Sequence, residues 1–206
     1  MKRNCLLALG ATALALTCPA RAELITFDSL TDNGIGTAIP NGYAGLDWNQ
    51  LYSLNVADYP NAWNYHGATG YPVVEQSAPN VAINYWGYGS EIYTKNGTYN
   101  LISGYFDAAI GDVTVTVLGY RGSTVAYSQT YNLTQSAETF ITFNYENITD
   151  ANFVLDAGNQ IAMDNLTVEL NPVAAPEPGQ VVAGVLLAGL GLVARRLGKR
   201  KGNQQS

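Results

Sequence analysis

Cysteine and histidine are nearly absent from this chain of 206 residues, which has two cysteines and one histidine. Cys5 and Cys18 both precede the main body of the sequence, so that body has no disulfide, no Cys-based metal site and no thiol nucleophile. His66 alone cannot build a histidine-rich zinc site. A Ser-His-Asp hydrolase would depend on His66, and no Gly-x-Ser-x-Gly element accompanies it. We therefore expect His66 to be an ordinary loop residue.

Positive charge is also scarce in the main body, residues 23–175. Lys95 and Arg121 stand there against fifteen Asp and Glu, which leaves a net charge of −13. A surface of this kind repels nucleic acid and anionic membranes, so neither is an expected partner. It attracts divalent cations and keeps the protein in solution.

No stretch of helical length in residues 23–175 has apolar residues at the period of a helix. Strict alternation of apolar and polar residues is common there. Val113, Val115 and Val117 alternate with threonine, a pattern typical of a half-buried strand. A hairpin turn is predicted at 121–123 and a type I′ turn at Asn96-Gly97. About ten short strands predict an all-β fold, a jelly-roll-like two-sheet antiparallel β-sandwich. The clearest predicted strands are 24–27, 80–86, 91–94, 98–106, 113–117, 125–131, 140–145, 152–156 and 160–170.

Aromatic residues are abundant between positions 48 and 71, among many Asn and Gln side chains. Tyr and Trp pack on the apolar faces of sugar rings, and amides bind the hydroxyl groups, so this mixture favours carbohydrate binding. Large aromatic side chains also fill the core of a sandwich that lacks disulfides. We assign Trp48 and Trp86 to the core. The predicted sugar-binding residues are Trp63, Asn64 and Tyr65.

The N-terminus has the three parts of a secretory signal peptide. Lys2 and Arg3 precede an apolar run at 5–17, and Ala20-Arg21-Ala22 is a cleavage signature for signal peptidase. Cleavage would leave Glu23 as the first residue of the exported protein. An alternative is acylation of Cys18 as in a lipoprotein, although Thr17 precedes it where a small Gly or Ala is usual.

The C-terminus joins Pro176-Glu177-Pro178 to an apolar run at 181–194 and then a basic cluster that starts with Arg195 and Arg196. This arrangement resembles the PEP-CTERM sorting signal of Gram-negative bacteria. The resemblance implies that an exosortase recognises the tripeptide while a short transmembrane helix holds the chain transiently in the inner membrane. An ordinary tail anchor is the alternative. The expected parts are a signal peptide (1–22), a β-sandwich ectodomain (23–171), a linker (172–180), a transmembrane helix (181–194) and a basic cytoplasmic tail (195–206).

A second resemblance concerns the ectodomain, through the segments 25–28, 39–48 and 161–168. They look like the secreted β-sandwich domain of many PEP-CTERM proteins, which is similar in plan to jelly-roll carbohydrate-binding modules. The resemblance implies that the first and last strands lie side by side. It also implies a structural Ca²⁺ held by Asp28 and Asp164, since calcium takes six to eight oxygen ligands. The alternative is that both aspartates cap turns or face solvent.

Three functions stay open at the level of the sequence, and none requires a cofactor beyond the possible Ca²⁺. The first is a non-catalytic protein of the cell surface or extracellular matrix, delivered by signal peptidase and exosortase. The second is a carbohydrate-binding module or adhesin that binds extracellular polysaccharide. The third is a glycan-active enzyme, which would need two carboxylates about 5–10 Å apart in a groove. We expect a protein that is not an enzyme.

Overall fold

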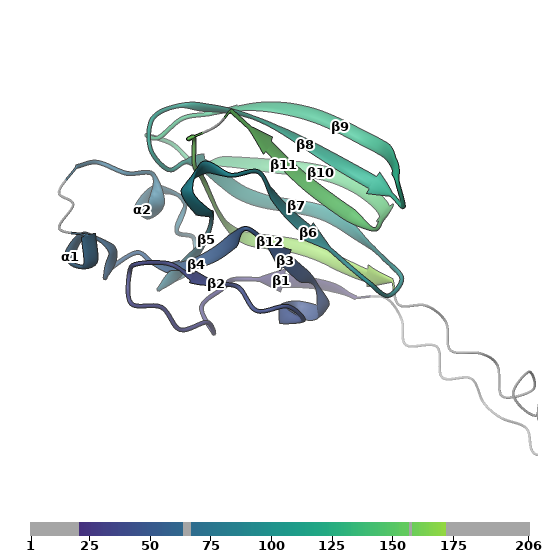
Figure 1. Cartoon of the computed structure of the whole chain (residues 1–206), viewed down its shortest axis with the longest axis horizontal. Helices are drawn as coiled ribbons and strands as arrows, with labels where there is room; N and C mark the ends of the chain where they lie inside the picture. The colour runs from purple at the N-terminus through teal and green to yellow at the C-terminus, as the bar shows by residue number, and fades with distance from the viewer. Residues whose placement is uncertain (1–20, 64–66, 157, 172–206) are drawn as a thin grey trace, which may run out of the picture. The chain divides into compact units, whose positions relative to one another are not determined.

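The structure, a computed structural model, describes residues 21–63, 67–156 and 158–171. Within those ranges, twelve strands form two antiparallel sheets that pack face to face (Figure 1). The prediction of an all-β, two-sheet antiparallel sandwich is therefore confirmed. Most of the predicted signal peptide and the whole sorting tail, with Pro176, Glu177, Pro178, Arg195 and Arg196, lie outside the described residues. In the described part, no helix has the length and apolar character needed to cross a membrane.

The larger sheet has seven strands in the described part of the chain and is called the seven-stranded sheet below. β1 pairs with the second half of β12, with Ile25 opposite Leu166, so the first and last described strands are neighbours as expected. β5 pairs with the start of β12 on the same side. In spatial order the strands are β10 (Thr139–Ile148), β7 (Thr98–Ala108), β12 (Ile161–Asn171), β5 (Asn80–Asn84), β4 (Leu51–Asn55) and β2 (Thr37–Ala38), with β1 (Ala22–Ile25) beside β12.

The second sheet, called the five-stranded sheet, has that number of strands within the described ranges. From β9 onward, successive strands alternate between the two sheets, which is how a jelly roll is wound. In spatial order its strands are β3 (Asp47–Asn49), β6 (Ser90–Tyr93), β11 (Asp150–Leu155), β8 (Val113–Arg121) and β9 (Thr124–Leu133).

The alternating sequence pattern explains the strands. In β8 the side chains of Val113, Val115 and Val117 are buried while Thr114 is exposed, as the period of two requires. Gly122 and Ser123 form the predicted turn between β8 and β9. The type I′ turn at Asn96-Gly97 is wrong. Only Gly97 of the two has a positive φ, and the strands on either side belong to different sheets.

The main hydrophobic core lies between the two sheets. Phe27, Phe106 and Phe153 are fully buried there, and Trp48 is 5 % exposed, which confirms its assignment to the core. The Trp48 ring meets Phe27 edge to face with centroids 5.6 Å apart, and its indole N–H donates to the carbonyl of Tyr43 at 3.0 Å. Tyr43 belongs to a short 3₁₀ turn, η1 (Tyr43–Gly45). A buried indole needs such a partner.

A second hydrophobic cluster lies on the outer face of the seven-stranded sheet. Val81 and Ile83 of β5 join it, while Ala82 between them faces the main core. This cluster is covered by the segment that contains α1 (Tyr59–Trp63) and α2 (Tyr71–Val74), which the sequence did not predict as helices. Helices of one turn lack the repeated period that predicts longer ones. Figure 1 shows them at the end of the sandwich where β12 begins.

Candidate functional site

A pocket opens at the end of the sandwich where the second cluster reaches the surface. Its volume is about 330 Å³. Six segments that are far apart in the sequence contribute to its wall, and most of the side chains are aromatic or aliphatic. The lining residues are Ile35, Leu54, Tyr59, Tyr71, Ile83, Tyr85, Trp86, Ile110, Gly158 and Gln160.

Two groups of aromatic rings shape the pocket. Tyr85 stacks on Tyr52 with ring centroids 4.1 Å apart and an interplanar angle of 16°, and its other neighbour is Trp86, edge on at 5.7 Å. The second group is Tyr59 of α1 and Tyr71 of α2, whose ring centroids are 4.8 Å apart, also edge to face. Packed rings of this kind hold one another in place, so the pocket presents aromatic surfaces in fixed orientations.

Trp86 is the most informative residue of the site, and its assignment to the core is wrong. Its side chain is 59 % exposed. The predicted strand 80–86 ends at Asn84, where the chain enters a 3₁₀ turn, η2 (Tyr85–Gly87). Trp86 has a φ of 49° there, in the left-handed region that a residue with a Cβ rarely adopts. Strain at such a residue persists only where the surroundings hold it, and it is concentrated at functional sites.

The buried amide of Asn84 holds the Trp86 turn in position. Its Nδ2 donates to the carbonyl oxygens of Tyr88 at 2.9 Å and Asn159 at 3.2 Å, and its Oδ1 accepts from the N–H of Ile161 at 2.7 Å. The two loops are also in direct contact, because a Cβ added at Gly87 would lie 2.6 Å from the backbone of Gly158. The start of β12 and the turn after β5 therefore form one rigid frame.

Replacing Asn84 with alanine is expected to lower the free energy of unfolding by about 2–3 kcal/mol, because buried backbone groups then lose their partners. Chemical denaturation followed by circular dichroism measures this loss. The control is Asn49→Ala, because the Asn49 amide is exposed and donates only to the Glu91 carboxylate. This replacement should lower the free energy of unfolding by less than about 1 kcal/mol. Equal losses in the two variants would show that Asn84 has no special part in the frame.

Gln160 is the main side-chain amide of the pocket wall. Its Oε1 accepts from the Tyr71 hydroxyl at 2.8 Å, and its Nε2 donates to the Asn84 carbonyl at 3.3 Å. This arrangement joins α2 to the Asn84 frame. It also places amide and hydroxyl groups beside the aromatic surfaces, so the pocket combines apolar area with a few fixed polar groups. That combination is typical of small-molecule binding sites.

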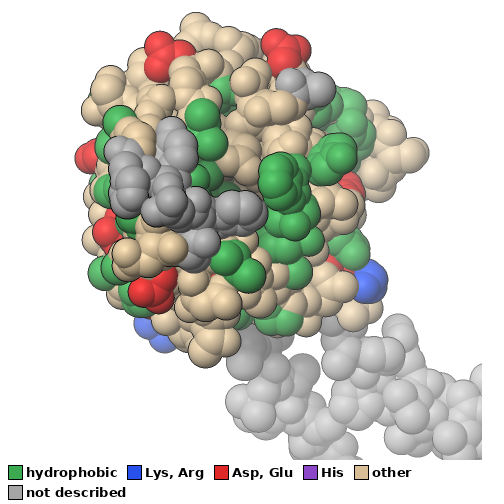
Figure 2. Space-filling model, turned by 60° about the vertical axis from the view of Figure 1, so that its left-hand side comes forward, with side chains coloured by type: hydrophobic (Ala, Val, Ile, Leu, Met, Phe, Trp, Pro, Cys, Tyr) green, Lys and Arg blue, Asp and Glu red, His purple; other side chains and the backbone are tan. Residues whose placement is uncertain are grey.

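Exposed apolar side chains surround the pocket. Ile35 and Ile110 are each 48 % exposed, and Tyr88, which follows the Trp86 turn, is 62 % exposed. Figure 2 shows hydrophobic side chains gathered on this end of the molecule. Contiguous exposed apolar surface on a soluble domain marks a place of interaction. The pocket and the exposed apolar side chains therefore lie at the same end of the sandwich.

The predicted sugar-binding residues fall mostly outside the described residues. Asn64 and Tyr65 lie outside them, as does His66, and only the backbone of Trp63 is described, as the last residue of α1. The neighbouring Tyr59 lines the pocket, so the aromatic segment of the sequence does reach the site. At the N-terminus, Ala20 of the cleavage signature lies outside the described residues, whereas Ala22 and Glu23 belong to β1.

The two predicted calcium ligands, Asp28 and Asp164, are close enough for the charge of Asp28 to raise the pKa of Asp164. Burial is the larger cause, and together they raise that pKa to about 6. The oxygens of Asp164 are already occupied, because Oδ2 accepts from the N–H groups of Gln76 and Ser77 and Oδ1 from that of Asn165. Among the described residues no three His, Cys, Asp or Glu side chains are placed to hold a metal. The donor set thus fits calcium poorly, and the calcium site stays a prediction.

Thermal unfolding tests that prediction, since a ligand that binds only the folded state must raise the midpoint. A calcium site at Asp28 and Asp164 requires a higher midpoint in millimolar calcium than in chelator. It also requires that Asp28→Asn remove this difference. An unchanged midpoint would end the calcium interpretation and leave Asp164 as an anchor for the loop at 76–77.

Among the described residues, Asp107 is the ionisable side chain whose oxygens are buried without any hydrogen-bond partner. It lies on β7 with no exposed surface, and neither carboxylate oxygen has a hydrogen-bond partner there. Gly70 packs directly against it, since a Cβ at Gly70 would lie 2.5 Å from Asp107 Oδ2. Burial, helped by the charge of Glu138, raises the pKa of Asp107 to about 8. At neutral pH the group is therefore protonated and uncharged.

Paired carboxylates occur away from the pocket. Asp150 of β11 is in contact with Glu91 of β6, and burial together with this neighbour raises the pKa of Asp150. Two carboxyl groups in direct contact are closer than the 5–10 Å separation that a glycosidase uses. The described residues that line the pocket include no Asp, Glu or His. The described part of the pocket wall thus carries no pair of carboxyl groups of the kind that a glycosidase uses.

No family model and no curated protein matches this chain. Solved structures do resemble it. One is a family 29 carbohydrate-binding module in complex with cellulohexaose, which is 14 % identical over 73 % of this chain and 91 % of that one, with a TM-score of 0.38. Another is a xylan-binding domain of family 22 from Paenibacillus barcinonensis, 15 % identical over 75 % and 95 %, with a TM-score of 0.37.

An enzyme is also among these structures. A family two carbohydrate esterase from Cellvibrio japonicus is 11 % identical over 76 % of this chain and 36 % of its own length, with a TM-score of 0.36. At TM-scores below 0.5, these likenesses do not decide what this chain binds. The case for a ligand therefore rests on the residues of the pocket.

Proposed function

We propose that residues 21–171 form a non-catalytic carbohydrate-binding domain whose binding site is the aromatic pocket. The observation that carries this proposal is Trp86, an exposed indole held in a strained turn at the rim of a pocket with two packed aromatic groups. Sugar rings have apolar C–H faces that stack on such rings. Their hydroxyl groups need a few fixed hydrogen-bonding groups, which Gln160 and the tyrosine hydroxyls supply.

The volume of the pocket limits the size of the ligand that it can bind. Ligand sites span roughly 300–1,000 Å³, and the pocket, at about 330 Å³, lies at the lower end of that range. It suits one or two sugar rings, such as the end of a polysaccharide chain or a short side branch. The low positive charge of the domain favours a neutral glycan over a strongly anionic one.

The proposed export fits the position of the pocket. Gln160 of the pocket wall precedes β12, and the sorting tail follows the other end of that strand, eleven residues later. A strand of that length spans about 35 Å. The pocket is therefore at the opposite end of β12 from Asn171, the last described residue. After sorting, the domain would display it at the cell surface or in the extracellular matrix.

A surface protein without a glycan ligand is the second candidate, because the Pro-Glu-Pro tail is an address and carries no activity of its own. Such a protein would not need the exposed indole of Trp86 at the rim of a pocket. The pocket therefore favours the carbohydrate-binding function, and the sorting tail is compatible with both.

A glycan array and a polysaccharide pull-down test the proposal. Residues 20–173 form one compact unit of the chain, with both sheets and both hydrophobic clusters inside it, so the fragment 21–171 is suited to this experiment. We expect specific retention on a neutral glycan in calcium and in chelator alike, since no described residue of the pocket wall is a carboxylate. A folded fragment that binds no glycan in either condition would overturn the proposal.

A further inference from the structure

In the described part of the chain, β9 is a long edge strand with no charged residue and no proline of its own to prevent pairing. It is the outer strand of the five-stranded sheet and is ten residues long. Nine of those residues are exposed or only partly buried, and Leu133 is the exception. An outer strand of this length presents a row of backbone N–H and C=O groups to any strand that approaches.

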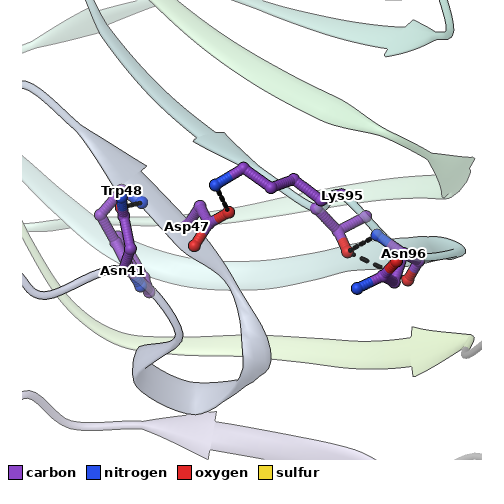
Figure 3. A network of polar contacts seen from close by, with 6 residues as sticks. Asn41, Asp47, Trp48, Lys95 and Asn96 are labelled. Carbon is purple, nitrogen blue, oxygen red and sulfur yellow. Dashed lines mark hydrogen bonds and ion pairs between the residues drawn. The ribbon is translucent and has the colours of Figure 1, made fainter.

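The remaining edges of the described sheets carry the features that normally prevent such pairing. β10 has two register shifts, with Asn144 and Asn147 at positive φ, and bulges of this kind twist an edge away from a partner. β2 has two residues, and β1 has four, of which Glu23 is charged. β3 has three, and Figure 3 shows the Lys95 ammonium reaching across to Asp47 on it, at 2.8 Å. Short strands and charged side chains both discourage pairing.

The chain around β9 contains neither charge nor proline. Sixteen consecutive residues, 122–137, are uncharged, and β9 itself contains two threonines, two tyrosines and one valine. Its ladder with β8 has one register shift, near the turn, and is regular from Tyr127 to Leu133. Hydroxyl and amide side chains continue across this ladder, with Thr116 and Thr130 hydrogen-bonded at 2.9 Å and Thr114 donating to Asn132 at 2.8 Å.

We propose that β9 pairs with β9 of a second copy of this chain, antiparallel about a two-fold axis, so that two five-stranded sheets become one continuous sheet. The charges at the two ends of the uncharged stretch argue for a second copy as the occupant. Arg121 precedes the stretch and Glu138 follows it, so an antiparallel pairing brings the Arg121 end of one copy to the Glu138 end of the other. Residues 21–171 carry fifteen acidic side chains and three basic ones, so two copies repel each other over most of their surface. The uncharged strand is where they can approach, and a two-fold axis sets that strand against itself.

Sedimentation of the fragment 21–171 tests the pairing. A single strand pair is a small interface, so we expect a monomer that becomes a dimer between about 10 µM and about 1 mM. Thr130→Lys on β9 should weaken the dimer at least about tenfold, because it places charge on the pairing edge. Thr142→Lys makes the same change at an exposed position of β10 and should leave the dimer unchanged. A monomer at every concentration, or equal effects of the two variants, would overturn the proposal.

Spin labels locate the interface independently, because residues 21–171 contain no cysteine and single cysteines can be introduced cleanly. With strands about 4.8 Å apart, labels at Gln129→Cys on the paired β9 strands lie close together. Labels at Asn49→Cys on β3, at the far edge, are separated by nine strand spacings, or about 43 Å. A short distance between the Asn49→Cys labels and a long one between the Gln129→Cys labels would contradict the β9 interface.

Discussion

Replacing Trp86 with alanine is expected to abolish retention on the bound glycan while the free energy of unfolding stays nearly unchanged. An aromatic side chain on which a ligand stacks commonly contributes about 2 kcal/mol or more, which is about 30-fold in affinity. Trp86 is 59 % exposed, so its removal leaves no large cavity in the core. We expect a loss of stability below about 1 kcal/mol. Titration calorimetry and thermal unfolding of the same samples measure both quantities.

Tyr88 is the matched control for Trp86. It lies two residues further along the same loop and is 62 % exposed, but it does not line the pocket. Tyr88→Ala should therefore bind the glycan about as well as the unchanged domain. If Tyr88→Ala and Trp86→Ala lose affinity equally, the glycan is held by the exposed apolar surface in general and the pocket is not its site.

Replacing Asp107 with asparagine is expected to stabilise the domain strongly in alkaline solution and hardly at all in acid. The carboxyl group of Asp107 is buried without a partner, and its pKa is raised to about 8 from an ordinary value of 3.8. Asparagine has nearly the same shape and no charge at any pH, so it imitates the protonated aspartic acid. The two proteins should therefore be equally stable at pH 4.

The sign of the effect follows from the pH at which Asp107 loses its proton in the folded chain and in the unfolded chain. Below about pH 4 the folded and unfolded chains both keep it. Between about pH 4 and pH 8 the unfolded chain releases it while the folded chain keeps it, and stability falls by about 1.4 kcal/mol for each pH unit. Above pH 8 the full loss of several kcal/mol is present. The advantage of Asp107→Asn should thus grow from pH 4 to pH 8 and then stay constant.

Urea unfolding of both proteins at several pH values measures this difference. Asp156→Asn is the control, because Asp156 is exposed and its replacement removes a charge from the surface. The stability difference between Asp107→Asn and the unchanged domain could also turn out not to depend on pH. That result would show that Asp107 is charged, with a partner, in the folded state.

The strands of this fold could be predicted because each needs only local information. Val113, Val115 and Val117 alternate with polar residues, and Ile141, Phe143 and Tyr145 alternate with Thr142 and Asn144. Burial on one face is therefore visible in the sequence. The pairing of β1 with β12 joins residues more than 140 positions apart. Periodicity does not contain that information, and only the resemblance to secreted β-sandwich domains implied it.

The pocket could not be predicted because its residues come together only through the sheet order. Ile35, Tyr71 and Ile110 are separated by dozens of residues and belong to different segments. The sequence predicts a core position for Trp86 because large aromatic side chains mostly fill the core of a sandwich without disulfides, and Trp86 ends the predicted strand 80–86. Gly87, with its φ of 72° and its close approach to Gly158, was the available signal that the chain turns there.

Nuclear magnetic resonance of the three tryptophan indoles tests the carbohydrate site most directly. Trp48, Trp63 and Trp86 each give one indole N–H signal in the fragment 21–171, and Trp86→Ala assigns the signal of Trp86. Titration with the retained glycan should shift the Trp86 signal strongly and leave that of Trp48 in place, since Trp48 is buried and bonded to Tyr43. If the glycan binds and the Trp86 signal does not move, the aromatic pocket is not the binding site.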